Sequence, residues 1–131
     1  MAVIYDKRYT EYDRDDLTAV ELQADGVLTG TSLILDGNVS SGPHEHVGLL
    51  LEDGDTGDAR TIVSRDSAVC PGRIAASQTV SIESLLTVNA SGLLIVATRG
   101  QMAVAQAIEA VTTSGGETAV IPVKLGRWLA V

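Results

Sequence analysis

The sequence predicts a mainly β fold of the α+β kind, a small β-barrel or β-tulip-like domain of short antiparallel hairpins with one short helix. Apolar stretches of three to six residues recur and are separated by Asp-Gly and Gly-Asp steps, the pattern of strands joined by tight turns. Apolar residues make up 45% of the chain, yet Phe is absent and Trp occurs once, so Val, Leu, Ile and Ala must fill the core. The 131 residues suffice for one ordinary domain.

The first sixteen residues, MAVIYDKRYTEYDRDD, are predicted to form an extended arm (1–16) outside a single domain of residues 17–131. They are rich in charge and show neither the helical nor the strand period of apolar residues. Tyr and Arg offer large contact areas and are enriched where proteins bind one another. The arm is therefore a candidate partner-binding segment, with a solvated tail as the alternative. Its candidate contact residues are Tyr5, Arg8, Tyr9, Tyr12 and Arg14.

The first half of the domain is predicted to contain short strands and one hairpin. An apolar stretch at 33–35 ends at an Asp-Gly-Asn turn. A second stretch, 47–51, is followed by the acidic turn of residues 52–58, and residues 59–64 return with alternating side chains. Since the last two stretches flank one Gly-containing turn, we expect them to pair as an antiparallel hairpin.

Residues 79–90 are predicted to contain the one short helix. Ser81 can serve as an N-cap, and Gly92 stands where a C-terminal cap belongs. Helical spacing places four residues on one face: Ile82, Leu85, Leu86 and Asn89. An apolar run of the kind found in buried strands follows at 93–97, and a turn follows at Arg99-Gly100.

A second hairpin is expected towards the C-terminus. Residues 102–111 fit two patterns, because their alanines favour a helix whereas their alternating side chains also fit a strand. A strand is favoured because a Thr-Thr-Ser-Gly-Gly turn follows and residues 119–125 then alternate as a return strand. Pro122 cannot donate a main-chain hydrogen bond, which predicts that this last strand lies at a sheet edge or contains a bulge.

The charge of the chain argues against several classes of partner. Its 17 acidic and 9 basic residues give a net charge of −8, which repels the phosphates of nucleic acids and anionic lipid surfaces. No apolar run is long enough to span a membrane, and the charged first ten residues do not resemble a signal peptide. We therefore expect neither a nucleic acid nor a membrane partner, and synthesis in the cytoplasm.

Two segments are candidate cation sites. His44 and His46 form a His-x-His pair on one side of an expected extended segment and could supply half of a metal site, with two loop side chains as the alternative. The acidic turn 52–58 resembles a calcium-binding loop, but it has Gly57 where an EF-hand needs an oxygen ligand and Ser64 where it needs Glu. A solvated turn is favoured, and no metal or other cofactor is expected.

Signals for catalysis are missing from the sequence. It contains no Gly-x-Ser-x-Gly elbow, and its glycines do not form a phosphate-binding loop. Cys70 is the only cysteine, so a disulfide within the chain is impossible, and it is expected to be a small buried or half-buried side chain. We therefore do not expect an enzyme.

Residues 47–98 contain a series of short motifs. The chain reads Val-Gly-Leu-Leu-Leu-Glu-Asp from residue 47, Ile-Val-Ser-Arg-Asp from residue 62, and Ser-Gly-Leu-Leu-Ile-Val from residue 91. This order resembles the head decoration proteins of tailed phages, the lambda type. In that family a valine-glycine-leucine-leucine strand, a strand running into arginine-aspartate, a helix and a glycine-isoleucine-valine strand follow one another. Residues 104–125 look like the C-terminal hairpin of a related group of small capsid-stabilising proteins.

The resemblance implies a structural virion protein, usually a homotrimer, that binds the major capsid protein on the outside of the capsid and stabilises it as a decoration or cement protein. The virion would be its location, after synthesis in the host cytoplasm, and the arm would contact the major capsid protein. The chain departs from the lambda type in continuing past the last of these strands. It also has Cys70-Pro71-Gly72 where that family has a Pro-Trp step.

Three other interpretations remain open. The chain could be another virion subunit, such as a tail-tube, head-fibre or head-completion protein, for which sixfold rings rather than threefold clusters would argue. It could be a small cellular β-barrel that binds sugar or peptide. It could also be an enzyme that uses His44 and His46, which would require bound metal and a loss of activity in His44→Ala.

Overall fold

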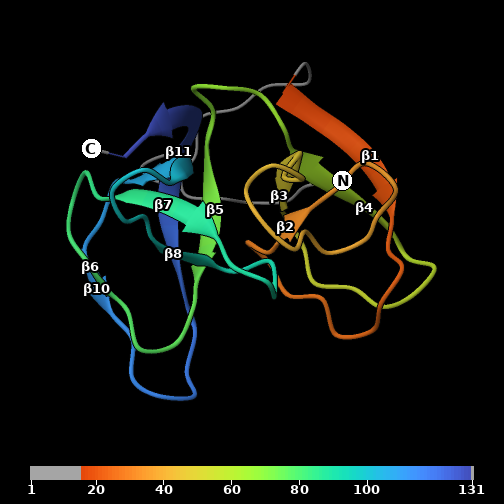
Figure 1. Cartoon of the computed structure of the whole chain (residues 1–131). Helices are drawn as coiled ribbons and strands as arrows, with labels where there is room; N and C mark the ends of the chain where they lie inside the picture. The colour runs from red at the N-terminus through yellow and green to blue at the C-terminus, as the bar shows by residue number, and fades with distance from the viewer. Residues whose placement is uncertain (1–15, 131) are drawn as a thin grey trace.

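The computed structural model describes residues 16–130, and these form the mainly β fold that the sequence predicts. The five candidate contact residues of the arm, Tyr5, Arg8, Tyr9, Tyr12 and Arg14, lie outside the described residues. Within residues 16–130 the strands are, in chain order (Figure 1), β1 (Leu17–Glu21), β2 (Ser32–Leu33), β3 (Gly48–Leu50), β4 (Ala59–Val63), β5 (Val69–Ile74), β6 (Thr79–Val80), β7 (Leu85–Val88), β8 (Leu94–Val96), β9 (Met102–Ala107), β10 (Val111–Thr112) and β11 (Ala119–Leu129).

The strands form a closed barrel, a four-stranded sheet and a two-stranded ribbon. The barrel has the order β11-β5-β8-β7-β9, the sheet has the order β1-β4-β3-β2, and the ribbon pairs β10 with β6. Neighbouring strands are antiparallel except β5 and β8, which are parallel where Ile74 lies opposite Leu94. Figure 1 shows the barrel and the sheet side by side, with β5 in the barrel wall between them. The prediction of a small β-barrel domain is confirmed.

Both predicted hairpins are confirmed as antiparallel pairs. β3 pairs with β4, with Leu49 opposite Val63, and β9 pairs with β11, with Ala107 opposite Val123. The segment 102–111 is a barrel strand only in its first six residues. The chain then leaves the barrel and begins β10, which pairs with β6. The connection between the two strands of the second hairpin is therefore longer than its turn residues suggested, since it includes β10.

The helix predicted within residues 79–90 is wrong, because this stretch forms β6, a tight turn and β7. In the turn, the Ser84 N–H donates to the Ser81 carbonyl, the Ser81 N–H donates to the Ser84 hydroxyl oxygen, and Glu83 has a φ of 72°. Gly92 has a φ of 77°, but at the turn between β7 and β8. Pairing of β7 on both sides outweighs a weak helical propensity. Among residues 16–130 no helix is long and apolar enough to cross a bilayer.

The last strand was expected to lie at an edge or to contain a bulge; it does contain a register shift, but it is not an edge strand and Pro122 does not lie at the shift. β11 runs between β5 and β9 in the barrel, and Pro122 lies opposite Pro71 of β5. Its carbonyl accepts the Ile108 N–H at 3.1 Å. Because the nitrogen and the carbonyl of a strand residue point to the same side, the nitrogen of Pro122 points away from Pro71, and their pairing needs no N–H. The register shift in β11 lies elsewhere, between Leu125 and Trp128.

The sheet is buried on both faces because its central strands alternate between two hydrophobic cores. Leu49 and Val63 belong to the core that fills the barrel, whereas Leu50 and Ile62 belong to a second core on the far face of the sheet. Side chains two residues apart on a strand share a face, which explains the alternation. The sheet therefore lies between the two cores. The face that carries Leu49 and Val63 packs against the barrel.

Gly30 joins the sheet to the barrel through its main chain. Its N–H donates to the Leu50 carbonyl at 2.7 Å, and its carbonyl accepts the Arg73 N–H at 3.0 Å. The Arg73 side chain follows the same route, since its Nε donates to the Thr29 carbonyl at 2.8 Å. At this junction the main chain of Gly72 and Arg73 lies so close to Gly30 that a side chain at Gly30 would collide with it.

Candidate functional site

The two histidines do not lie on one side of an extended segment as predicted, because residues 43–45 form a turn. His44 is exposed, whereas His46 is only 6% exposed. Nδ1 of His46 lies 2.7 Å from the Ser32 hydroxyl oxygen, and that hydroxyl donates to the Ser40 hydroxyl at 2.8 Å. Since Ser32 has only one hydroxyl hydrogen, His46 is the donor to Ser32. The histidines therefore do not face a shared ligand.

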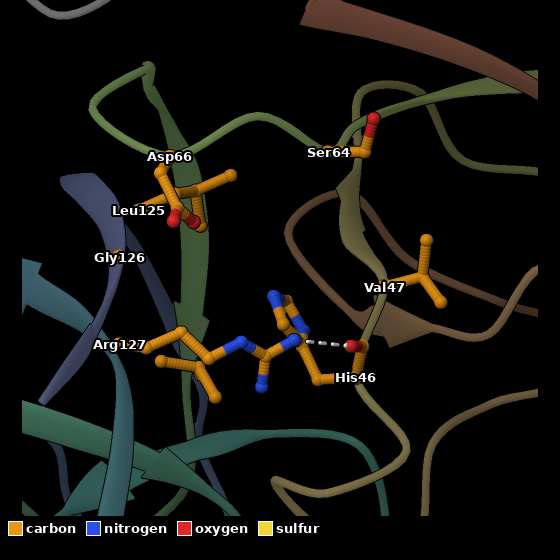
Figure 2. A pocket seen from close by; sticks show the side chains of 8 residues that line it. His46, Val47, Ser64, Asp66, Leu125, Gly126 and Arg127 are labelled. Atoms are coloured by element: carbon orange, nitrogen blue, oxygen red, sulfur yellow. Dashed lines mark hydrogen bonds between the residues drawn. The ribbon is translucent and has the colours of Figure 1, made fainter. Parts of the chain in front are cut away.

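Arg127 of β11 holds the chain next to His46 in place (Figure 2). Its Nη2 donates to the His46 carbonyl at 3.0 Å, and its Nη1 donates to the Pro43 carbonyl at 3.2 Å. A cavity of about 20 Å³ lies beside these groups, lined also by Ser64 and Asp66. This volume holds about one water molecule, so no substrate fits there. The hydrogen bonds of Arg127 therefore attach the β2–β3 loop to the barrel.

The environment of His46 keeps its ring neutral. Burial, with a smaller contribution from the positive charge of Arg127, lowers the pKa of His46 from 6.5 to about 4. A protonated imidazole would add a charge to a buried site that already holds a guanidinium. At neutral pH the ring therefore acts as a hydrogen-bond donor to Ser32, and its role is structural.

The described residues contain no arrangement for tight metal binding. Between residues 16 and 130, no group of three or more His, Cys, Asp or Glu side chains is placed to hold a metal ion. Cys70 is fully buried, as the sequence predicts, and burial raises the pKa of its thiol. A buried thiol with a raised pKa is a weak nucleophile.

The acidic turn 52–58 fastens a neighbouring loop of the chain. One carboxylate oxygen of Asp53 accepts both the Thr29 N–H at 2.6 Å and the Thr29 hydroxyl at 2.8 Å. Asp55 accepts the Gly26 N–H at 2.8 Å. The hydrogen bonds from Thr29 lower the pKa of Asp53. These contacts favour the interpretation as a turn over that as a calcium loop, because the carboxylates are engaged within the chain.

Replacing Asp53 with alanine is expected to lower the free energy of unfolding by about 1 kcal/mol, because Thr29 loses an ionised acceptor at an exposed site. The contribution is present above the ordinary carboxyl pKa of 3.8 and is lost as the pH falls through the lower folded-state pKa. Urea unfolding at pH 7 measures the loss. Glu52→Ala, at the exposed neighbouring position, should cost less than about 0.5 kcal/mol, and equal losses for the two variants would rule out the fastening role.

Sequence reasoning missed the residues that fasten these loops, namely Arg73, Arg127, Ser32 and Ser40. None belongs to a spaced motif, and their partners lie up to 84 positions away along the chain. The strand pattern of β11 gives no signal either, because it contains two charged residues, Lys124 and Arg127, and does not distinguish between them.

β1 has one side on which the described residues leave main-chain groups unpaired. β1 forms one edge of the four-stranded sheet, and the Asp16 carbonyl accepts the Ser64 N–H at 2.8 Å on the β4 side. Since successive strand residues point to opposite sides, the main-chain groups of Leu17 and Ala19 point outward, where residues 16–130 place no strand. Gly37 packs against the far end of β1. Within residues 16–130, the open part of the edge is therefore its first half, which directly follows residue 16 in the sequence.

Comparison with known proteins does not identify a family. The chain matches no protein-family model and no curated protein sequence. The resemblance to the decoration and capsid-stabilising proteins therefore rests on the short motifs within residues 47–98 and on the hairpin pattern of residues 104–125.

Proposed function

We propose that this protein is a structural virion subunit that binds the outer surface of a viral capsid and stabilises it as a decoration protein. The observation that carries the proposal is the position of β1, an edge strand whose open part directly follows the Tyr- and Arg-rich arm. The major capsid protein is the proposed partner of the arm, and other copies of this chain are its proposed neighbours on the shell.

An edge strand with a preceding arm suits this role for a physical reason. An extended segment can add to an exposed sheet edge and gain main-chain hydrogen bonds together with alternate side-chain contacts. Many identical copies on a closed shell let weak contacts act together, because a trimer that touches several capsid subunits binds with multivalent avidity. The net charge of −8 helps to keep free subunits apart in solution.

The use of the polar side chains also supports a structural role. His46 donates to a buried serine, Asp53 accepts from a loop threonine, and Arg127 binds two main-chain carbonyls. Each of these groups fastens a loop to the body of the protein. Such contacts stiffen a small domain that must present a fixed surface.

Substitution of the three arm tyrosines tests the proposal. A full-length variant with Tyr5→Ser, Tyr9→Ser and Tyr12→Ser should bind capsids at least about tenfold more weakly than the wild-type chain, because each aromatic contact contributes on the order of 1 kcal/mol or more. Capsids assembled from the major capsid protein of the same genome serve as the binding partner in sedimentation. Thr10→Ala, in the same arm, should bind as the wild type does.

The unfolding midpoint of the triple variant should equal that of the wild type, since the substitutions lie in the predicted arm of residues 1–16 and not in the predicted domain of residues 17–131. Unchanged capsid occupancy by the triple variant would remove the arm from the proposal. Binding of the wild-type chain to tail tubes, with capsids left bare, would favour the tail-tube alternative instead.

A further inference from the structure

Two unlike apolar features lie at opposite ends of the barrel strand β9. At one end, Ile82 lies in the β6–β7 turn and is 64% exposed, and Ile108 follows β9 and is 38% exposed. The turn is joined to the end of β9 because the Glu83 N–H donates to the Ala107 carbonyl at 2.8 Å. We name Ile82, Ile108 and their acidic neighbours Glu83 and Glu109 the isoleucine end.

At the other end, a mostly apolar hollow of about 370 Å³ is lined by Met102, Trp128 and Leu129 together with His44 and Arg127. Leu129 is 66% exposed and lies opposite Met102 in the pairing of β11 with β9. The indole of Trp128 lies over Gly126, where a side chain would collide with the ring. We name this feature the tryptophan hollow.

Basic side chains accompany the tryptophan hollow. Arg127 is part of its lining. Arg99 lies in the adjoining turn, which is tied to the end of β11 because the Gly100 N–H donates to the Ala130 carbonyl at 2.7 Å. Only 9 of the 131 residues are Lys or Arg, so two arginines beside one hollow are a local exception to the acidic surface.

The two features are complementary in shape and in charge. One presents a protruding isoleucine on a tight turn beside Glu83 and Glu109, and the other presents an apolar hollow beside Arg99 and Arg127. The six residues of β9 separate them by roughly 17 Å, given a rise of about 3.3 Å per residue. A single copy therefore cannot bring its own two features together, whereas two copies can.

We infer that this protein associates with itself head to tail, with the isoleucine end of one copy seated in the tryptophan hollow of the next. Contact between unlike surfaces leaves one free surface of each kind after every addition, so the chain of copies continues until rotation closes it into a ring. The number of copies in the ring rests on the proposed function, because a closed ring of three copies would be the trimer named there. Burial of exposed isoleucine and leucine supplies the apolar contact, and the opposed charges orient it.

Two single substitutions test this geometry, and each replaces an exposed side chain. Ile82→Asp and Leu129→Asp should each convert the wild-type oligomer to monomers, because every copy of a given variant lacks the same surface. An equimolar mixture of the two variants should form dimers of one copy of each, because the intact hollow of the first accepts the intact isoleucine end of the second. Light scattering coupled to size-exclusion chromatography measures the masses.

Leu35→Asp is the matched control, since Leu35 is 65% exposed but belongs to neither the isoleucine end nor the lining of the hollow. It should leave the wild-type mass unchanged, and the circular dichroism spectra of all three variants should match that of the wild type. A monomeric wild-type chain, a variant that keeps the wild-type mass, or a mixture that stays monomeric would each overturn the inference. Because no capsid is present, such a result leaves the capsid-binding proposal to its own test.

Discussion

Replacing Gly30 with alanine is expected to lower the free energy of unfolding by about 3 kcal/mol or more. Gly30 has a φ of 87°, a left-handed conformation that an L-residue adopts at a cost of about 1–2 kcal/mol. A Cβ there would also lie 2.5 Å from the main-chain nitrogen of Arg73 and 2.9 Å from the carbonyl carbon of Gly72. The sheet and the barrel would have to separate to admit it.

Gly57 provides a matched control for this substitution. It has the same φ of 87°, but a Cβ added there meets nothing within 4 Å. Gly57→Ala should therefore cost only the backbone strain, about 1–2 kcal/mol. Urea unfolding of both variants measures the difference. Equal midpoints for Gly30→Ala and Gly57→Ala would mean that the junction between sheet and barrel admits the added methyl group with no loss of free energy of unfolding.

The stability of the protein is expected to fall by about 3 kcal/mol between pH 7 and pH 4 because of His46. The folded-state pKa of about 4 lies below the unfolded value of 6.5. Between these values the unfolded chain binds a proton that the folded chain does not, so stability is lost as the pH falls. The difference of about 2.5 pH units corresponds to about 3 kcal/mol. The charged groups that face His46 across its small cavity are those of Arg127 and Asp66.

His46→Gln isolates this effect, since it keeps a hydrogen-bond donor but does not titrate. Its free energy of unfolding, measured by urea titration at intervals from pH 7 to pH 4.5, should vary much less than that of the wild type. His44→Gln, at the exposed histidine, should follow the wild-type profile. A wild-type profile that stays flat over this range would contradict the buried, neutral state of His46.

Local patterns predicted the hairpins because their information lies within a few neighbouring residues. The acidic turn 52–58 and the Gly-containing turn after residue 111 mark where the chain reverses, and strand alternation identifies the flanking segments. The helix failed because residues 79–90 also satisfy helical spacing, and only the neighbours of β7 in the barrel decide between the two. Closure of the barrel depends on such distant pairs.

β5 escaped prediction for a different reason. Its sequence contains Pro71 and Gly72, two residues that usually interrupt strands. In the barrel, Pro71 pairs with another proline, Pro122, where no N–H is needed. Gly72 makes room for the neighbouring strands, since a Cβ there would lie 2.8 Å from both Leu94 and Val123 side-chain atoms. Both residues are therefore accommodated in a strand only because β11, about fifty positions away along the chain, pairs with β5.

The candidate site was predicted less well than the fold. Burial of His46 follows from contacts with Ser32 and Arg127, neither of which a local pattern connects to it. The arm residues were identified from composition, and the described structure adds the edge strand that follows them. The position of β1 at a sheet edge could not be read from its own five residues, because an edge is defined by which strand is missing beside it.

Sedimentation of the purified wild-type protein with capsids of the same genome tests the central claim most directly. The proposal predicts that the protein pellets with capsids, saturates at a fixed ratio to the major capsid protein, and raises the temperature at which the capsids come apart. Capsids incubated alone and protein centrifuged alone provide the controls. Protein that stays in the supernatant at every capsid concentration, with the capsids no more stable than before, would contradict the account.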